Sequence, residues 1–466
     1  MKTKYIIASV LCAFLLGCEK EKLELTQPQN NTSTFQESSF YYKEKPTEEI
    51  TRLANDGEYT FVAKIGKAAS ESGNILLNTT EMAKIVNNYN TFKGVKDFSL
   101  LPNNYYSFEG NTYNAGDTQA EAKLTIKNFS SLAYGDYLLP LKVTMAGQEM
   151  FHLVILNKDS EYSPITETSK KPMPPATYSC NNRTEPMKMV AYVETNDWDI
   201  RNMGQFILKD SKKPVFDIVI LFAPNMNYNT QTGKRTLFFN EKLQPIVNDP
   251  DKYIKPLKDR GIKVLATILP NHQGVGYFNF QNYEEAREFA TECKIWADKL
   301  GLDGYDIDEE YAEYYKLPSK PRKGSQSVFW FMRAMKEVMP DKLLTLYDYD
   351  HGLQRDSVDE LGKHVSDYVD YSWANYNENH GSFSDIPDER YGSFSIEANW
   401  GWSMSYADYF ANHNLENCFG MLMIFNINGE HIKDGSTATN LSKATMLFYG
   451  EETIFNGKYH KGPKDN

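Results

Sequence analysis

Eight short apolar segments, spread over residues 187 to about 460, constrain the fold of this chain more than any other feature. Longer helical segments separate them, and the clearest is Tyr283–Leu300, whose apolar residues recur at helical spacing before Gly301. Such alternation is typical of repeated βα units, and eight strands fit a (β/α)8 TIM barrel in an α/β domain. The predicted strands are Met189–Val193, Phe216–Phe222, Ile262–Leu269, Gly304–Asp308, Leu343–Tyr347, Tyr368–Trp373, Phe394–Glu397 and Phe419–Phe425.

The fourth of these strands leads into a row of acidic residues. Side chains alternate between the two faces of a strand, so Asp306, Asp308 and Glu310 share one face. Burying three carboxyl groups together costs desolvation and repulsion, which packing alone does not explain. Crowding raises the pKa of at least one carboxyl and keeps it protonated as an acid near neutral pH. Barrel active sites lie at the carboxyl ends of the strands, which is where we expect Glu310.

Charge and composition narrow the classes of ligand. The chain has 466 residues and a formal net charge of −12, without a basic stripe, which argues against nucleic acid and favours a neutral substrate. Hydrophobic residues make up 41% and aromatic residues 14%, enough to bury the cores of two domains. The aromatic side chains suit stacking on sugar rings, and they equally suit core packing.

The N-terminus reads as an export signal. Lys2 and Lys4 precede a short apolar run that ends in Leu15-Leu16-Gly17-Cys18, and this ending resembles a bacterial lipobox. We expect residues 1–17 to be a lipoprotein signal peptide and Cys18 to carry the lipid; an ordinary cleaved signal is the alternative. Polar residues 18–39 form a predicted flexible tether. The expected location is the bacterial outer membrane, lipid-anchored and exposed at the cell surface.

Residues 40–165 have the pattern of a small all-β sandwich domain. Alternating segments separated by turn residues predict strands at Glu58–Lys64, Ala120–Lys127, Tyr137–Met145 and Met150–Asn157, with a short helix at Thr79–Asn88. The segment resembles the sandwich domains that precede catalytic domains in Bacteroidetes surface lipoproteins. It acts either as a spacer or in binding glycans or partners. A proline-containing linker at 166–186 then leads to the barrel domain at 187–462.

Three cysteines are left after Cys12 and Cys18. Cys180, Cys293 and Cys418 are widely spaced and odd in number. They lack CxxC or metal-ligand spacing, so we expect neither a disulfide framework nor a zinc site.

The motifs of the barrel segment resemble those of a known family. Residues 303–310 match the DGxDxDxE signature of glycoside hydrolase family 18. The loops Phe222–Tyr228, Leu269–Gly274 and Glu309–Tyr314 follow the second, third and fourth strands, as in endo-β-N-acetylglucosaminidases of the endoglycosidase H and F1 type. The resemblance covers about residues 187–460. Chitinase, or a glycan-binding lipoprotein without turnover, are the alternatives.

The resemblance implies hydrolysis of the GlcNAc-β-1,4-GlcNAc bond in the core of N-glycans of the high-mannose type. Family 18 enzymes retain configuration by using the substrate's own acetamide as nucleophile. By resemblance, Glu310 is the acid and then the base, Asp308 orients the acetamide and stabilises the oxazolinium ion, and Asp306 holds Asp308. No metal or cofactor is expected. The expected partners are N-glycans on glycoproteins, with no nucleic acid and no membrane contact beyond the lipid on Cys18, and the protein is expected to be a monomer.

Further site residues follow from the same resemblance. Asn375 and Tyr376, after the sixth strand, are expected near the acetamide. Trp198, Trp400 and Trp402 either stack on sugar or pack in the core, and His272 is given no role in proton transfer. The expected substrate-binding residues are Asn225, Asn271, His272, Gln273, Tyr311, Phe425 and Asn426.

Overall fold

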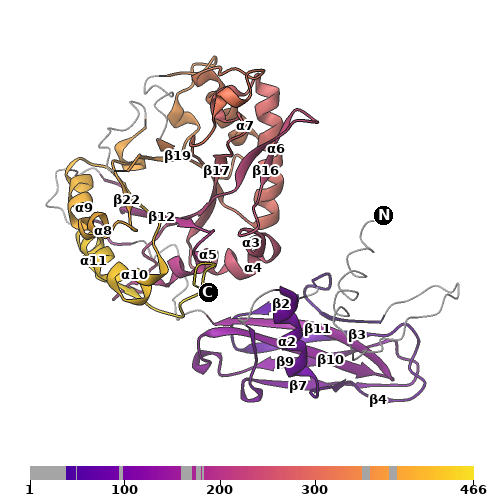
Figure 1. Cartoon of the computed structure of the whole chain (residues 1–466). Helices are drawn as coiled ribbons and strands as arrows, with labels where there is room; N and C mark the ends of the chain where they lie inside the picture. Colours follow the sequence, from indigo (N-terminus) through magenta and orange to yellow (C-terminus); the bar gives the residue numbers. More distant parts are fainter. Residues whose placement is uncertain are drawn as a thin grey trace. The chain divides into compact units, whose positions relative to one another are not determined.

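The computed structural model divides the chain into two compact units, Met1–Asp159 and Ser160–Asn466 (Figure 1). It describes residues 38–48, 50–93, 98–158, 171–174, 180, 183–348, 357–376 and 386–465. The predicted signal peptide, Cys18 and nearly all of the tether lie outside the described residues, as does most of the predicted linker. In the described ranges, none of the helices combines the length and apolar character needed to cross a bilayer.

In its described residues, the N-terminal unit consists of β-sheets and the helix α2 (Met82–Lys93). One sheet has the order β1-β3-β9-β7, a second has the order β2-β11-β10-β5 with β6 beside β10, and β4 pairs with β8. All four predicted strands are present, and the predicted helix begins three residues later than expected, as α2 (Met82–Lys93). The strands are β1 (Ser39–Tyr42), β2 (Ile50–Leu53), β3 (Gly57–Lys64), β4 (Gly73–Asn74), β5 (Leu76–Leu77), β6 (Phe98–Leu100), β7 (Tyr106–Gly110), β8 (Thr112–Tyr113), β9 (Gln119–Ile126), β10 (Gly135–Met145) and β11 (Gln148–Lys158).

The hairpin between β10 and β11 shows how local sequence determines a turn and a strand register in this unit. Met145 pairs with Gln148, which leaves a two-residue turn. Ala146 and Gly147 both adopt positive φ, 47° and 76°. Positive φ at both central residues defines the turn that matches the natural twist of two antiparallel strands. The register then points Val143, Met145 and Met150 into the core.

The C-terminal unit is a parallel barrel (Figure 1). All eight predicted strands are present, and the sheet order is β21-β20-β19-β18-β17-β14-β12-β23-β22. The seventh strand is split in two: β21 pairs with β20, β22 pairs with β23, and Ser393 and Phe394 link the two halves. The strands are β12 (Lys188–Glu194), β14 (Ile218–Phe222), β17 (Lys263–Pro270), β18 (Gly304–Ile307), β19 (Leu343–Asp348), β20 (Tyr371–Ala374), β21 (Tyr391–Gly392), β22 (Ser395–Glu397) and β23 (Met421–Phe425).

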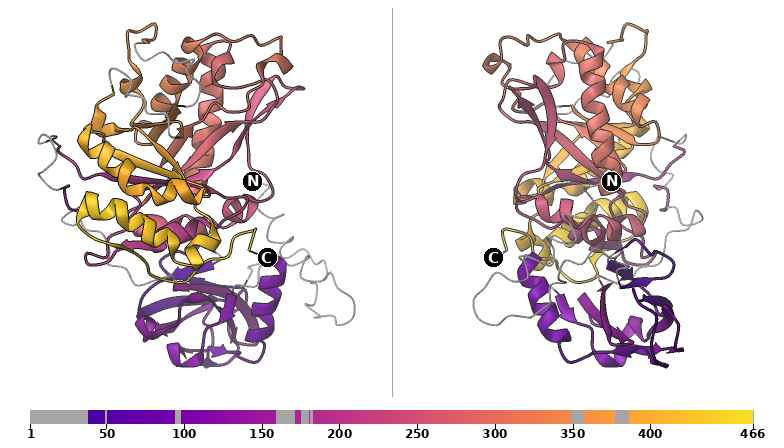
Figure 2. Two further views of the ribbon diagram at one scale, coloured as in Figure 1. Left: turned by 60° about the vertical axis from the view of Figure 1, so that its left-hand side comes forward. Right: turned by 90° about the vertical axis from the view of Figure 1, so that its right-hand side faces the viewer.

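Helices lie around the outside of this barrel, and α6 (Tyr283–Leu300) runs along the strands in both views of Figure 2. Its bounds are as predicted, because the Asn282 side chain caps its start and Gly301, at φ 71°, ends it. The predicted helix after the fourth strand is α7 (Ser325–Val338). The others are α3 (Gln244–Asn248), α4 (Pro250–Tyr253), α5 (Lys255–Asp259), α8 (Gly401–Ser405), α9 (Ala407–Glu416), α10 (Gly429–Lys433) and α11 (Ser436–Tyr449).

Two apolar layers hold the barrel together. Outward side chains of the strands pack against the helices, as where the Tyr305 hydroxyl donates to the Cys293 carbonyl of α6 at 2.7 Å. Inward side chains fill the interior, including Val190, Tyr192, Leu265 and Trp373. An interior filled with side chains is a packed core, so chemistry is confined to its carboxyl-terminal end.

A disulfide joins Cys180 to Cys418, and the expectation of no disulfide is therefore wrong. The two cysteines are 238 residues apart in sequence, and only the tertiary fold brings them together. Cys293 is buried and free on α6. Disulfides persist in oxidising compartments, which agrees with the export signal read from the sequence.

Replacing both Cys180 and Cys418 with Ala should lower the free energy of unfolding by about 2–4 kcal/mol, because the bridge restricts a long loop of the unfolded chain. Urea unfolding, followed by tryptophan fluorescence, measures the change. Reducing agent should destabilise the wild type by the same amount and leave the double variant unaffected. Equal midpoints for wild type and variant would contradict this expectation.

Candidate active site

The acidic row lies at the carboxyl end of β18. Asp306 and Asp308 are buried, and Glu310, partly exposed, follows in the turn after the strand. Tyr305, on the opposite face, contacts α6. As the alternation predicted, side chains on one face of β18 point into the barrel, and those on the other face point toward the helices.

Asp306 is held by hydroxyl groups from three other strands of the barrel. Tyr192 of β12 donates at 2.6 Å, Thr345 of β19 at 2.6 Å and Thr267 of β17 at 3.2 Å. Burial raises the pKa of Asp306 to about 7, and these hydrogen bonds oppose the rise. Trp373 extends the network by donating to the Tyr192 hydroxyl at 3.0 Å.

The family resemblance predicted that Asp306 holds Asp308. In the structure Asp306 accepts hydrogen bonds from the three hydroxyls, and it acts on Asp308 through charge. Those hydroxyl residues were missed. A tyrosine or threonine at an inward position of an otherwise apolar strand was the available signal.

Asp308 and Glu310 form a coupled pair of carboxyls. Burial, followed by the nearby charges of Glu310 and Asp306, raises the pKa of Asp308 well above its usual range. The backbone N–H of Glu310 donates to Asp308 at 3.2 Å, which opposes the rise. Burial also raises the pKa of Glu310. The site therefore retains protons near neutral pH, and Glu310 is the member nearest the surface.

Glu309, the fourth carboxyl of the segment, braces the neighbouring loop. It accepts hydrogen bonds from the backbone N–H of Tyr277, at 2.9 Å, and from the Tyr314 hydroxyl. Both carboxylate oxygens of Glu309 accept these bonds, on the side of the chain opposite to Glu310. The role of Glu309 is therefore structural.

The loops after β17 and β18 are tied to each other. His272 N–H donates to the Tyr311 carbonyl at 2.9 Å, and the His272 ring meets the Glu313 carboxylate at 3.1 Å. All three residues have positive φ: 55° for His272, 60° for Tyr311 and 48° for Glu313. Such backbone is costly for residues other than glycine and persists where its surroundings enforce it. The outcome is a fixed Tyr311, whose hydroxyl bonds the Glu310 carboxyl.

Replacing Tyr311 with Phe should move the alkaline limb of the kcat/KM profile to higher pH. The hydroxyl lowers the pKa of Glu310 by stabilising its charged form, so its removal raises that pKa and keeps the acid protonated for longer. The loss at the pH optimum should stay within about tenfold, as for one hydrogen bond. A pH–rate profile of both proteins measures this. An unchanged limb, or one moved to lower pH, would contradict it.

Asn375 and Tyr376 follow β20 and come together with a tyrosine that the sequence analysis missed. Tyr347 of β19 donates to the Asn375 side chain at 2.5 Å. Burial, and then the charge of Asp308, raises the pKa of Tyr347, which places this hydroxyl close to the carboxyl row. Tyr376 lies edge-on to Phe425 at 5.0 Å, so both residues predicted there belong to one cluster.

The predicted polar residues after β14 and β17 join two loops. β15 (Asn225–Asn229) and β16 (Lys234–Phe238) form a hairpin beside β17. Asn271 donates to the Asn227 side chain at 2.8 Å, and Gln273 accepts from Tyr228 N–H at 2.6 Å. Asn225 itself donates to the Leu269 carbonyl at 3.4 Å. These hydrogen bonds shape the rim of the site. Each amide side chain uses only part of its hydrogen-bonding capacity in them.

Two further carboxyls at the barrel mouth were also missed. Glu194 ends β12 and Glu397 ends β22. Burial raises the pKa of Glu194 to about 7, with added repulsion from Asp197, Glu397 and Glu310, and burial also raises the pKa of Glu397. The Asn426 side chain bonds Glu397. They stand on strands far apart in sequence, so no local motif links them to Glu310.

The three candidate tryptophans differ in the exposed fraction of their side chains. Trp198 is 6% exposed and packs beneath Gly429 and Gly462, so it belongs to the core. Trp400 and Trp402 are exposed at 46% and 56%. In the described part of the chain, no group of three or more His, Cys, Asp or Glu residues is arranged to hold a metal ion.

A family model described as an N-terminal domain matches residues 30–150. An endo-β-N-acetylglucosaminidase of Flavobacterium sp. (strain SK1022) is 31% identical over 271 residues, which cover 57% of this chain and 82% of that protein. Endo-β-N-acetylglucosaminidase F1 of Elizabethkingia meningoseptica is 32% identical over 203 residues, which cover 43% of this chain and 59% of that protein.

Two solved structures share the fold. EndoBT-3987 of Bacteroides thetaiotaomicron with Man5GlcNAc product matches with a TM-score of 0.55 and 21% identity, covering 92% of this chain and 98% of that one. The same protein with Man9GlcNAc2Asn substrate matches with a TM-score of 0.56 and 21% identity, covering 90% and 95%.

The barrel and the acidic row on its fourth strand define a glycoside hydrolase of the family 18 type. Similarity to the Flavobacterium protein extends over most of that relative's length. The chain belongs to the endo-β-N-acetylglucosaminidase family.

Proposed function

We propose that this protein hydrolyses the GlcNAc-β-1,4-GlcNAc bond in the core of high-mannose N-glycans and leaves one GlcNAc on the protein. The observation that carries the proposal is the pair of carboxyl groups formed by Asp308, which is buried, and Glu310, which is partly exposed. Both groups have raised pKa values. Two curated relatives carry the name of this activity. The structural neighbour EndoBT-3987 binds Man9GlcNAc2Asn and Man5GlcNAc.

The first step would use Glu310 as the acid. Its proton passes to the glycosidic oxygen while the bond from that oxygen to the anomeric carbon breaks. The oxygen of the substrate's acetamide forms the new bond to the anomeric carbon, giving an oxazolinium ion. Positive charge then develops beside Asp308 and favours its carboxylate form. Asp306, held by its three hydroxyl partners, adds its own charge to the surroundings of Asp308.

The second step would use Glu310 as the base. Its carboxylate takes a proton from water, whose oxygen attacks the anomeric carbon and opens the oxazolinium ring. The acid is regenerated, and two displacements at one carbon give net retention. Tyr347 and Asn375, hydrogen-bonded to each other at 2.5 Å, offer polar groups for the acetamide.

Intact-mass spectrometry of a high-mannose glycoprotein, after incubation with residues 19–466, tests the proposal. We expect a mass loss that leaves a single GlcNAc on the protein. An unchanged mass, together with cleavage of chito-oligosaccharides, would replace the proposal with a chitinase activity. Tight glycan binding without any product would replace it with a binding role.

We also propose that Cys18 carries a lipid that anchors the protein on the outer face of the outer membrane, with residues 40–165 as a separate domain before a barrel at 187–462. The Cys180–Cys418 disulfide supports exposure to an oxidising compartment. Replacing Cys18 with Ala should release the protein from the membrane fraction. Proteases added to intact cells should digest the wild type, and full protection would contradict surface exposure.

A further inference from the structure

A row of aromatic rings leads away from the carboxyl cluster. Tyr376 stacks on Trp400, with ring centroids 5.7 Å apart and planes at 23°. Trp400 stacks in turn on Trp402, at 6.0 Å and 15°. At its inner end Tyr376 meets Phe425 edge-on at 5.0 Å. The row therefore begins beside Asn375 and Tyr347, inside the candidate site, and ends in solvent.

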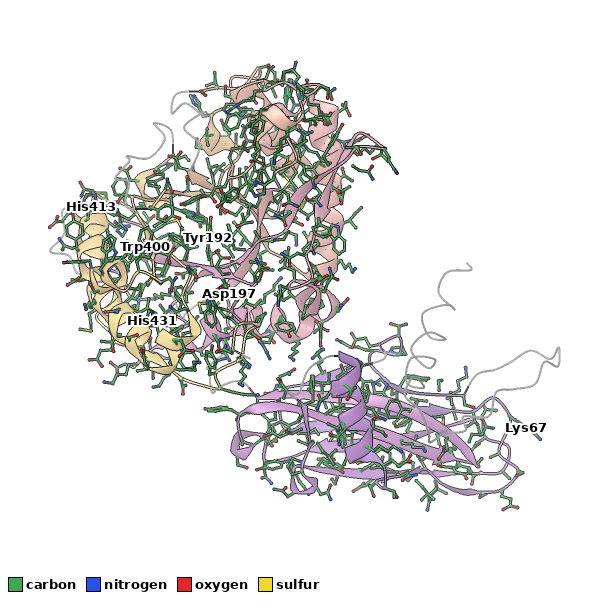
Figure 3. All side chains as sticks on the ribbon, in the orientation of Figure 1. Lys67, Tyr192, Asp197, Trp400, His413 and His431 are labelled. Atoms are coloured by element: carbon green, nitrogen blue, oxygen red, sulfur yellow. A yellow bond between two sulfur atoms is a disulfide. The ribbon has the colours of Figure 1, made fainter. Side chains whose placement is uncertain are left out.

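Backbone contacts hold the row in place. Ser395 N–H of β22 donates to the Tyr376 carbonyl at 2.7 Å. The Trp400 carbonyl accepts from Ser403 N–H at 2.8 Å in the first turn of α8. Ser403 and Met404 of α8 are buried and anchor that helix. Figure 3 shows Trp400 on the side of the barrel that carries α8 and α9, with Tyr192 toward the interior. Rings fixed in this way lose little entropy when a ligand covers them.

The exposure of these rings is unusual for a structural stack. Trp400 is 46% exposed and Trp402 is 56% exposed, and Tyr406, four residues further along the chain, is also 56% exposed. Exposed apolar surface beside an active site is typical of ligand binding. Flat aromatic faces complement the C–H faces of pyranose rings.

The charge around the row favours a neutral ligand. Residues 395–410 contain Glu397 and Asp408 and no Lys or Arg. Lys443, which reaches this region, donates its ammonium group to the Ser405 carbonyl at 2.6 Å. Sialylated or sulfated sugars would therefore be repelled by the two carboxylates of this segment.

We propose that Trp400 and Trp402 form a subsite for a neutral hexopyranose of the glycan arm beyond the sugar that Asp308 engages. This inference rests on the proposed function and assigns part of its specificity. The row starts at Tyr376, next to the groups that would hold the acetamide, so it continues from the sugar that is released and not from the GlcNAc that remains on the protein.

Calorimetry with the inactive Glu310→Gln protein tests binding apart from turnover. Replacing Trp402 with Ala in this background should weaken binding of a free high-mannose oligosaccharide by about two- to tenfold, as for loss of one aromatic contact. Trp402→Tyr should restore most of the affinity. Binding of a GlcNAc disaccharide without mannose should be unchanged. Phe151→Ala, an exposed aromatic of the N-terminal unit, is the control and should change neither affinity.

Unchanged affinity for the oligosaccharide, or an equal loss for the disaccharide, would overturn the subsite. Weaker binding of intact glycoprotein alone would instead assign the rings to the polypeptide, and a change in sedimentation would assign them to contact between two copies. Thermal midpoints equal to that of the parent exclude misfolding. If wild type cleaves nothing while Trp402 still governs glycan binding, the proposed function fails and the subsite stands.

Discussion

Replacing Glu310 with Gln should lower kcat for release of high-mannose glycans by about 10³-fold or more, in the range known for loss of a general acid. Gln has nearly the same shape, but its amide has no acidic proton for the leaving oxygen and no charge with which to activate water. The buried pair also loses one of its two repelling carboxyls, so folding should not suffer. Glycan release, followed by chromatography under saturating substrate, measures the loss.

The matched control for this variant is Glu288→Gln. Glu288 lies on the exposed face of α6, paired with Lys234, and its substitution should leave kcat within about twofold. Binding of oligosaccharide should survive in Glu310→Gln, because the shape of the site is kept. Wild-type kcat in Glu310→Gln would remove Glu310 from the mechanism.

The second large effect is expected for Asp308→Asn. The amide cannot supply the negative charge that stabilises the oxazolinium ion, so kcat should fall by about 10²–10³-fold, comparable to removal of one preorganised electrostatic contact. KM should change much less, since the interaction develops in the transition state. Steady-state kinetics with a high-mannose glycopeptide separate the two constants.

Stability gives a second readout for the same variant. Burial raises the pKa of Asp308, and the nearby charges of Glu310 and Asp306 raise it further. Removing one carboxyl from such a cluster relieves desolvation and repulsion, so the thermal midpoint should be equal or higher while activity is lost. A variant that loses activity only because it unfolds at assay temperature would contradict the assigned role.

The periodicity of residues explains why much of the fold was predictable. Hydrophobic spacing and end signals placed α6 correctly, because Asn282 and Gly301 act within a single turn of the chain. Strand alternation placed Asp306, Asp308 and Glu310 on one face for the same reason. The split of the seventh strand at Ser393 was not predicted, because barrel closure depends on both neighbouring strands.

The surroundings of the acidic row were not predictable in the same way. Tyr192, Thr267 and Thr345 reach Asp306 from three different strands, and Glu194 and Glu397 meet at the mouth from the first and the seventh. No local sequence pattern distinguishes Trp198 from Trp402, yet the side chain of Trp198 is buried and that of Trp402 is exposed.

The sequence alone determined the order of the eight barrel strands, the DGxDxDxE motif and the family resemblance, because each depends on neighbours a few residues apart. The tertiary structure alone decided which hydroxyls hold Asp306, that Cys180 bonds Cys418, and that Tyr376, Trp400 and Trp402 form one row. These contacts join segments that are distant along the chain, and closure of the barrel brings them within bonding distance.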